Sequence, residues 1–156
     1  MKILYSNEKK EIIKQLEYYG VSELPYLLVE SSKGRIRGYS GNFSLKELQE
    51  LQNSVRLEVI GMYMFNTYEE GIRLSLDAIH LLKSQIKKNI LEIDNKQAEE
   101  WMRGQDILIN EEDKEKWKNE EKGFKVIKNK DDFIGCGKLL ADRIVNYLPK
   151  ERRAKK

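Results

Sequence analysis

The sequence predicts an α+β fold built from two units, a small amino-terminal α/β unit over residues 1–72 and a second unit over residues 73–156. Three observations support this fold class. The chain has 156 residues, 40% of them hydrophobic, which suffices for one ordinary domain or two small ones. Apolar residues recur at helical spacing in some segments and gather in short strand-like runs in others. The pattern changes around Gly71, where we place the boundary.

The amino-terminal unit is expected to begin with a helix followed by a hairpin. Residues 8–19 carry apolar side chains at helical spacing, and Gly20 ends the helix. The apolar run 24–29 predicts a strand, and 35–39 predicts its hairpin partner across a polar turn.

A second helix and a third strand complete this unit. Ser44 with Glu47 three residues later has the pattern of a helix cap, ahead of a short leucine stripe. Residues 55–65 are rich in β-branched and aromatic types and predict a strand, with Gly61 as a candidate bulge.

The second unit is expected to start with one long helix over 74–88, because its apolar residues follow a 3.6-residue period. A strand is predicted over 90–93. Asp94 or Asn95 then caps a helix that runs to about Met102.

The rest of the second unit alternates between surface and strand patterns. Residues 111–122 are a charged surface excursion with Trp117 as its apolar anchor. Residues 124–127 and 133–138 are expected to pair as strands across a polar turn. Residues 140–148 are ambiguous, since apolar residues four apart favour a helix on periodicity alone.

Composition excludes several classes of protein. With 29 Lys and Arg against 26 Asp and Glu, the net charge is +3. One cysteine forms no intramolecular disulfide and no multi-thiolate metal site, and the amino terminus becomes charged too early for a signal peptide. The longest run without Asp, Glu, Lys or Arg, 59–68, is about half of a membrane-spanning helix. We therefore expect a soluble, cytoplasmic protein.

No active site emerges from the residue pattern, so no catalytic residue, metal or cofactor is predicted. The run Gly135 to Lys138 resembles a phosphate-binding loop, but its spacing is wrong. Its glycines suit either a tightly packed strand or close approach of a ligand. Cys136 has no nearby base to activate it and is expected to be a buried, inert thiol, while His80 is expected on a helix surface.

The positive charge lies at the carboxyl end. Residues 133–156 hold 7 basic and 2 acidic side chains, a density that suits phosphate contacts, although a disordered solubilising tail would look similar. Asn146 and Tyr147 could add a base hydrogen bond and a stacking ring. The turn 103–105, Arg-Gly-Gln, offers a second site, or an ordinary helix C-cap.

These segments resemble a known RNA-binding module. Residues 94–107 look like the opening helix and turn of a PUA domain, named from pseudouridine synthases and archaeosine transglycosylases. Residues 123–127, 133–138 and 143–153 resemble the PUA-like carboxyl-terminal extension of Sun/Fmu-type RNA cytosine-5 methyltransferases. The amino-terminal unit looks, more loosely, like the segment that precedes this module in stand-alone relatives linked to ribosome biogenesis.

The resemblance implies a PUA-like mixed β-barrel with flanking helices, with a strand in the 140–148 region. It also implies an RNA-binding accessory in rRNA or tRNA maturation or modification. No methyltransferase activity is expected, because the chain has no room for an S-adenosylmethionine fold. The residues expected to contact RNA are Arg103, Gly104, Gln105, Gly135, Gly137, Lys138, Arg143, Asn146, Tyr147, Lys150, Arg152 and Arg153.

The alternative is a protein-interaction adaptor. Such a chain would dock on a ribosome-assembly factor or a separately encoded RNA methyltransferase. It would use the apolar segment 59–68 or Trp117, since exposed aromatic residues can anchor a partner.

Overall fold

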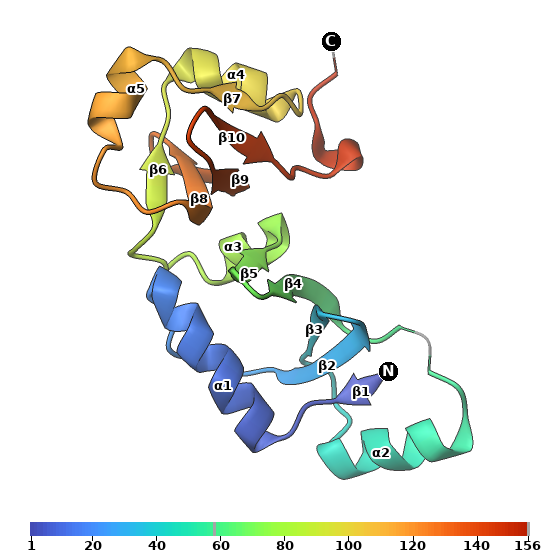
Figure 1. Cartoon of the computed structure of the whole chain (residues 1–156). Helices are drawn as coiled ribbons and strands as arrows, with labels where there is room; N and C mark the ends of the chain where they lie inside the picture. The colour runs from blue at the N-terminus through green and yellow to red at the C-terminus, as the bar shows by residue number, and fades with distance from the viewer. Residues whose placement is uncertain (58, 156) are drawn as a thin grey trace.

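The computed structural model describes residues 1–57 and 59–155 and contains two five-stranded sheets (Figure 1). The first sheet has the order β1-β2-β3-β4-β5, with every neighbouring pair antiparallel. Its half of the chain contains β1 (Lys2–Ile3), α1 (Ser6–Leu16), the 3-10 turn η1 (Glu17–Tyr19), β2 (Leu27–Ser32), β3 (Arg35–Tyr39), α2 (Leu45–Ser54), β4 (Met62–Tyr68) and β5 (Gly71–Leu74).

The second sheet has the order β6-β8-β9-β10-β7, in which β6 and β8 are parallel and the other pairs antiparallel. It curls into a half-barrel flanked by helices, which confirms the predicted fold class (Figure 1). Its elements are α3 (Leu76–Leu81), β6 (Ile90–Glu92), α4 (Asn95–Met102), β7 (Ile107–Leu108), α5 (Glu111–Lys116), β8 (Gly123–Asn129), β9 (Asp132–Leu139), β10 (Arg143–Asn146) and the 3-10 turn η2 (Lys150–Arg152).

Helix caps are where the sequence predicted them. The Ser44 side chain accepts a hydrogen bond from the Glu47 amide, and Asp94 does the same for the Gln97 amide at the start of α4. Gly20, with φ of 93°, ends the first helical segment. These local signals need no tertiary partner, which explains why sequence alone located them.

Two predicted elements are shorter than expected. Residues 55–57 and 59–61 are irregular, and β4 begins only after Gly61, whose φ of 78° precedes the strand; Glu58 lies outside the described residues. The predicted helix 74–88 was wrong in extent, since α3 covers only Leu76–Leu81. Leu74 belongs to β5, and after α3 the chain turns so that the Lys87 amide donates to the Tyr19 carbonyl at 2.9 Å.

The 140–148 region contains no helix; its residues 143–146 form the strand β10, so the helical periodicity was misleading. β10 pairs with both β9 and β7, and Ile144 lies opposite Leu139 and Ile107. Ile144 and Leu148 are both buried, and Ile144 packs in the hydrophobic cluster of the second sheet.

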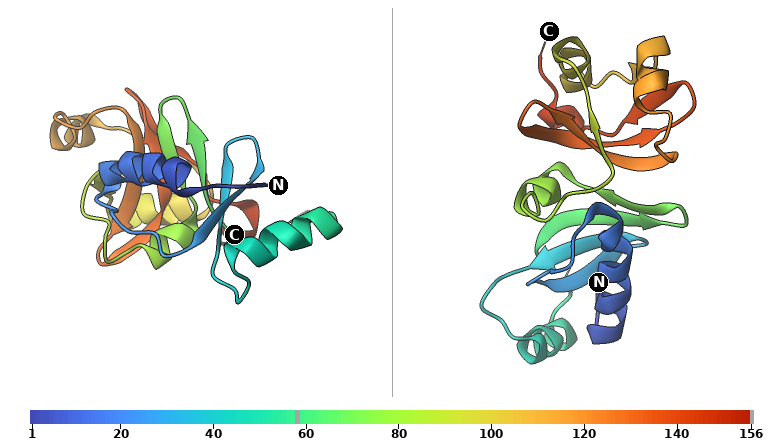
Figure 2. Two further views of the ribbon diagram at one scale, coloured as in Figure 1. Left: turned by 90° about the horizontal axis from the view of Figure 1, so that it is seen from below. Right: turned by 90° about the vertical axis from the view of Figure 1, so that its left-hand side faces the viewer.

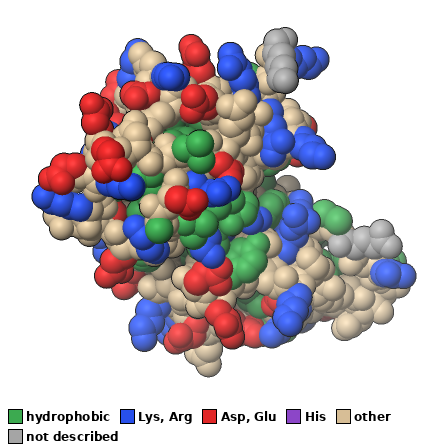
Figure 3. Space-filling view, turned by 45° about the horizontal axis from the view of Figure 1, so that its top comes forward, with side chains coloured by type: hydrophobic (Ala, Val, Ile, Leu, Met, Phe, Trp, Pro, Cys, Tyr) green, Lys and Arg blue, Asp and Glu red, His purple; other side chains and the backbone are tan. Residues whose placement is uncertain are grey.

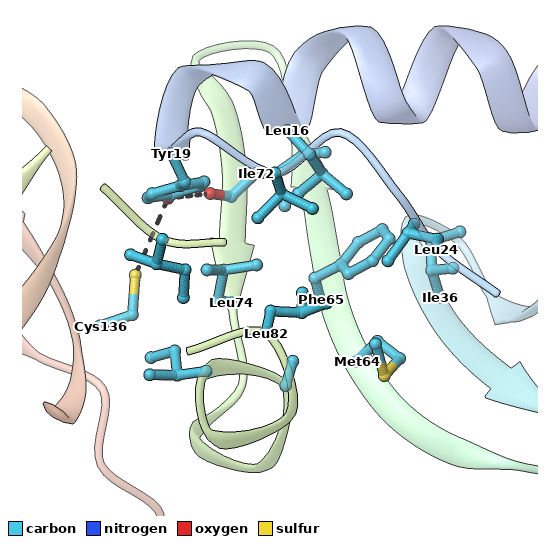
Figure 4. Packing of buried hydrophobic residues seen from close by; sticks show 14 of the residues in the cluster. Leu16, Tyr19, Leu24, Ile36, Met64, Phe65, Ile72, Leu74, Leu82 and Cys136 are labelled. Atoms are coloured by element: carbon cyan, nitrogen blue, oxygen red, sulfur yellow. Dashed lines mark hydrogen bonds between the residues drawn. The ribbon is translucent and has the colours of Figure 1, made fainter. Parts of the chain in front are cut away.

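One hydrophobic cluster joins the two halves of the molecule. It contains Tyr19 and Ile72 from the first half and Phe124 and Cys136 from the second. Figure 4 shows Tyr19, Ile72 and Cys136 in this cluster. The Tyr19 hydroxyl donates to the Ile72 carbonyl. Cys136 is buried as predicted, and burial raises the pKa of its thiol to about 11.

Helix α3 occupies the junction between the two sheets (Figure 2). It contacts β4 of the first sheet and β9 of the second. Among the described residues, no helix is long and apolar enough to cross a lipid bilayer.

Candidate functional site

A pocket of about 300 Å³ opens at the junction of the two sheets. Strands β3, β4 and β5 supply one wall, the start of α3 and β9 supply others, and the segment after β10 closes it. Its charged and aromatic lining residues are Arg35, Tyr63, Arg73, Asp77, Tyr147, Glu151 and Arg152. Residues from both ends of the chain therefore converge on one concave surface.

The strand register brings the first-sheet residues together. Asn66 on β4 lies opposite Arg35 on β3 and opposite Arg73 on β5. The register of β3 and β4 shifts between Tyr63 and Phe65, so that Met64 and Phe65 are both buried while Tyr63 faces the same side as Asn66. The Tyr63 hydroxyl donates to the Asn66 side-chain oxygen at 3.0 Å.

Both arginines of this wall stack on tyrosine rings. The guanidinium carbon of Arg35 lies 4.6 Å from the centre of the Tyr63 ring, and that of Arg73 lies 4.3 Å from the Tyr147 ring. Within the described part of the chain, neither guanidinium makes a hydrogen bond or an ion pair. Their N–H donors are therefore available to a ligand.

The third arginine of the pocket has a carboxylate partner. The Arg152 guanidinium lies 2.6 Å from the Asp77 carboxylate, and both side chains are more than 40% exposed. Glu151 adds a second carboxylate to the lining. Three guanidinium groups and two carboxylates leave the pocket with one net positive charge.

The predicted turn 103–105 and the carboxyl-terminal tail lie against each other. The Arg153 side chain packs on Gly104, and its Nε donates to the Leu148 carbonyl at 3.1 Å. The Ala154 amide donates to the Met102 carbonyl at 2.6 Å. The two segments that sequence analysis singled out therefore form one surface; Lys156 lies outside the described residues.

Residues 88–154 match the family model described as the methyltransferase RsmF PUA domain. Residues 88–154 form a PUA-like domain. Curated relatives include the ribosomal RNA small subunit methyltransferase F of Aliivibrio fischeri, which is 29% identical over 106 residues, 68% of this chain and 21% of the relative. The Aeromonas salmonicida protein is 25% identical over 104 residues, 65% of this chain and 20% of the relative. This chain therefore spans about a fifth of the length of the relatives it matches.

The glycines of the PUA-like domain have a packing role. A Cβ on Gly137 would lie 2.7 Å from the Trp101 ring and 2.7 Å from Ile144, and one on Gly135 would lie 3.0 Å from the Trp101 ring nitrogen. Both glycines are buried, although Gly135 also borders the pocket. The sequence left open whether these glycines serve a tightly packed strand or the close approach of a ligand. The structure shows the tightly packed strand, and contact of the glycines with RNA stays a prediction.

Asn146 is used within the PUA-like domain itself. Its side-chain amide donates to the Trp101 and Gln105 carbonyls, each at 2.9 Å, and its oxygen accepts from the Leu148 amide at 2.7 Å. The side chain that was expected to read a base thus holds the turn after α4 in place.

The remaining predicted basic residues differ in their surroundings. Lys138 pairs with Glu70 at 3.0 Å. Arg143 pairs with Asp142 at 3.2 Å and Asp106 at 3.7 Å, and the Asp142 hydrogen bond raises the pKa of this guanidinium. Arg103 and Lys150 are exposed. Acidic and basic side chains are interspersed on the face shown in Figure 3.

Sequence analysis missed Arg35, Tyr63 and Arg73. They are distant in the chain and share no motif, and only strand register and the packing of the PUA-like domain bring them to Tyr147. Trp117, offered as an exposed anchor for a protein partner, is buried in the core of the PUA-like domain.

Proposed function

We propose that this chain binds structured RNA and serves as an accessory in ribosomal RNA modification or maturation, without transferring a methyl group itself. The observation that carries the proposal is the pair of arginines without ion-pair partners, Arg35 and Arg73, facing a PUA-like domain across one pocket. Available guanidinium donors beside aromatic rings suit phosphate and base contacts.

Similarity to known proteins supports the proposed class of ligand, which is RNA. The PUA-like domain is similar to a domain of ribosomal RNA small subunit methyltransferases, proteins named for acting on ribosomal RNA. Transfer RNA, the other substrate class expected from sequence, would offer the same phosphate chemistry. A small-subunit ribosomal RNA hairpin is therefore the first RNA to test, with a transfer RNA beside it.

Salt dependence tests the proposal directly. Affinity for a fluorescently labelled hairpin, measured by anisotropy between 50 and 200 mM salt, should fall with a log–log slope of roughly −0.7 to −0.9 for each phosphate contacted. Replacing Lys150 and Lys155 together by Gln should weaken binding about fivefold and make the slope shallower by about one or two units.

The matched control removes the same charge elsewhere. Lys10 and Lys14 lie exposed on α1, so replacing both by Gln should leave the slope unchanged. An RNA affinity that does not change with salt would contradict an RNA contact through this surface. So would a Lys150/Lys155 variant whose affinity and slope equal those of the Lys10/Lys14 variant.

A further inference from the structure

We propose that the junction pocket holds a single unpaired nucleotide of the RNA, with its base on the Arg35–Tyr63 stack and its phosphate on Arg73. This inference rests on the proposed function and adds to it the feature of the RNA that is selected. Neither the sequence pattern nor the similarity to the PUA domain places a nucleotide here.

Pocket size is the first argument. A volume of about 300 Å³ is at the low end for ligand pockets and leaves no room for a helical segment. A duplex contacts a protein through its grooves and phosphates, whereas an unstacked nucleotide can be inserted into a concave site. The pocket therefore fits one nucleotide swung out of the RNA.

Charge is the second argument. Arg152 is already paired with Asp77, and Glu151 adds another carboxylate, so the lining carries one net positive charge. One backbone phosphodiester carries one negative charge. The single net positive charge of the lining matches the one phosphate of a nucleotide within a chain. A nucleoside di- or triphosphate would bring several negative charges close to the carboxylates of Asp77 and Glu151.

The arrangement of rings and donors is the third argument. Arg73 is half-buried and Arg35 is exposed, so the deeper guanidinium suits the phosphate and the outer Arg35–Tyr63 stack suits the base. Nucleic-acid bases stack on tyrosine rings and on guanidinium planes, largely without regard to sequence. The Tyr63 ring is held in place by its hydroxyl bond to Asn66.

Two hairpin RNAs, identical except for one bulged uridine, test the proposal. Wild-type protein should bind the bulged RNA roughly tenfold more tightly than the fully paired one, as loss of one stacked base implies. Arg73→Gln and Tyr63→Leu should weaken binding of the bulged RNA more than binding of the paired RNA, so that the preference is lost. Tyr63→Phe keeps the ring and loses only the hydroxyl bond to Asn66, so it should keep most of the preference.

Arg103→Gln is the control variant. Arg103 is exposed at the end of α4 and does not line the pocket. Its replacement should therefore lower the affinity for both RNAs by the same factor. If wild-type protein binds both RNAs equally with normal salt dependence, the pocket proposal is overturned and the proposed function stands. If neither RNA binds, both fail.

A crosslink on the wild-type protein keeps the test independent of variants that fold poorly. With 4-thiouridine at the bulge, irradiation should attach the RNA to a peptide that contains Tyr63 or Arg73. Attachment only at the turn 103–105 would overturn the proposal. A free nucleoside monophosphate offers the same chemistry, so uridine monophosphate should compete only at millimolar concentration, and micromolar competition would point to a small-molecule site instead.

Discussion

Trp101 explains the glycine spacing that first attracted attention in the sequence. Its ring is fully buried, and its Nε1 donates to the Ile134 carbonyl at 2.9 Å. The ring lies against β9 at Gly135 and Gly137, where a larger side chain would have to displace it. The glycines are therefore matched to one tryptophan in the core of the PUA-like domain.

Gly137→Ala should destabilise the fold by about 1–3 kcal/mol through overpacking, since the new methyl would meet Trp101, Ile144 and a backbone oxygen within 3 Å. Urea unfolding measures the loss. Introduced into a Trp101→Phe variant, which lacks the obstructing ring atom, the same change should cost less, and the difference is the coupling energy of the pair. Additive losses would show that Trp101 is not the obstacle.

At the scale of elements, Asn146 fastens the end of β10 to the turn after α4. Its side chain bonds to the carbonyl of Trp101 in α4, the carbonyl of Gln105 in that turn and the amide of Leu148, so it fixes the path of the tail. The tail in turn contributes Tyr147 and Arg152 to the pocket. One side chain thus connects the local fold to the position of the proposed site.

Asn146→Ala should cost about 1.5–4.5 kcal/mol, from three hydrogen bonds at about 0.5–1.5 kcal/mol each, and should speed hydrogen exchange at the Leu148 amide. Asn129→Ala is the matched control, because Asn129 also donates to a backbone carbonyl, that of Ile93, but away from the tail. Equal protection of Leu148 in the two variants would rule out the fastening role.

Elements with local signals could be predicted from the sequence, and those set by tertiary packing could not. The capped helices α2 and α4 were located because a cap and a stripe are short-range patterns. The predicted helix 74–88 failed because Leu74 and Ile86 are buried by a strand and a turn, and yet their spacing imitates a helix face.

The residues of the candidate site also fall into a part that the sequence predicts and a part that it does not. The turn and tail were found because basic residues, glycine and asparagine cluster in the sequence. Arg35, Tyr63 and Arg73 were not, because their side chains converge through the register of three strands and an irregularity in β4. No window of sequence contains that information.

For the whole molecule, the sheets are separate but the core is shared. Leu16 of α1 and Ile72 of β5 belong to the same buried cluster as Phe124, and the Tyr18 hydroxyl donates to the Phe124 carbonyl at 2.7 Å. The boundary between residues 72 and 73 stays a prediction, but this cluster crosses it. A pocket formed by both halves requires them to keep one relative position, which the shared core supplies.

The halves should therefore unfold together. Both tryptophans lie in the PUA-like domain, so their fluorescence follows that half, whereas far-ultraviolet circular dichroism follows all helices and strands. We expect the two urea transitions to coincide. Leu16→Ala, a fully buried truncation in α1, should lower stability by about 2–5 kcal/mol and shift the tryptophan midpoint as far as the circular dichroism midpoint. If Leu16→Ala leaves the midpoint of the tryptophan-fluorescence transition unchanged, residues 1–72 and 73–156 fold independently. The pocket between them would then lack a fixed geometry.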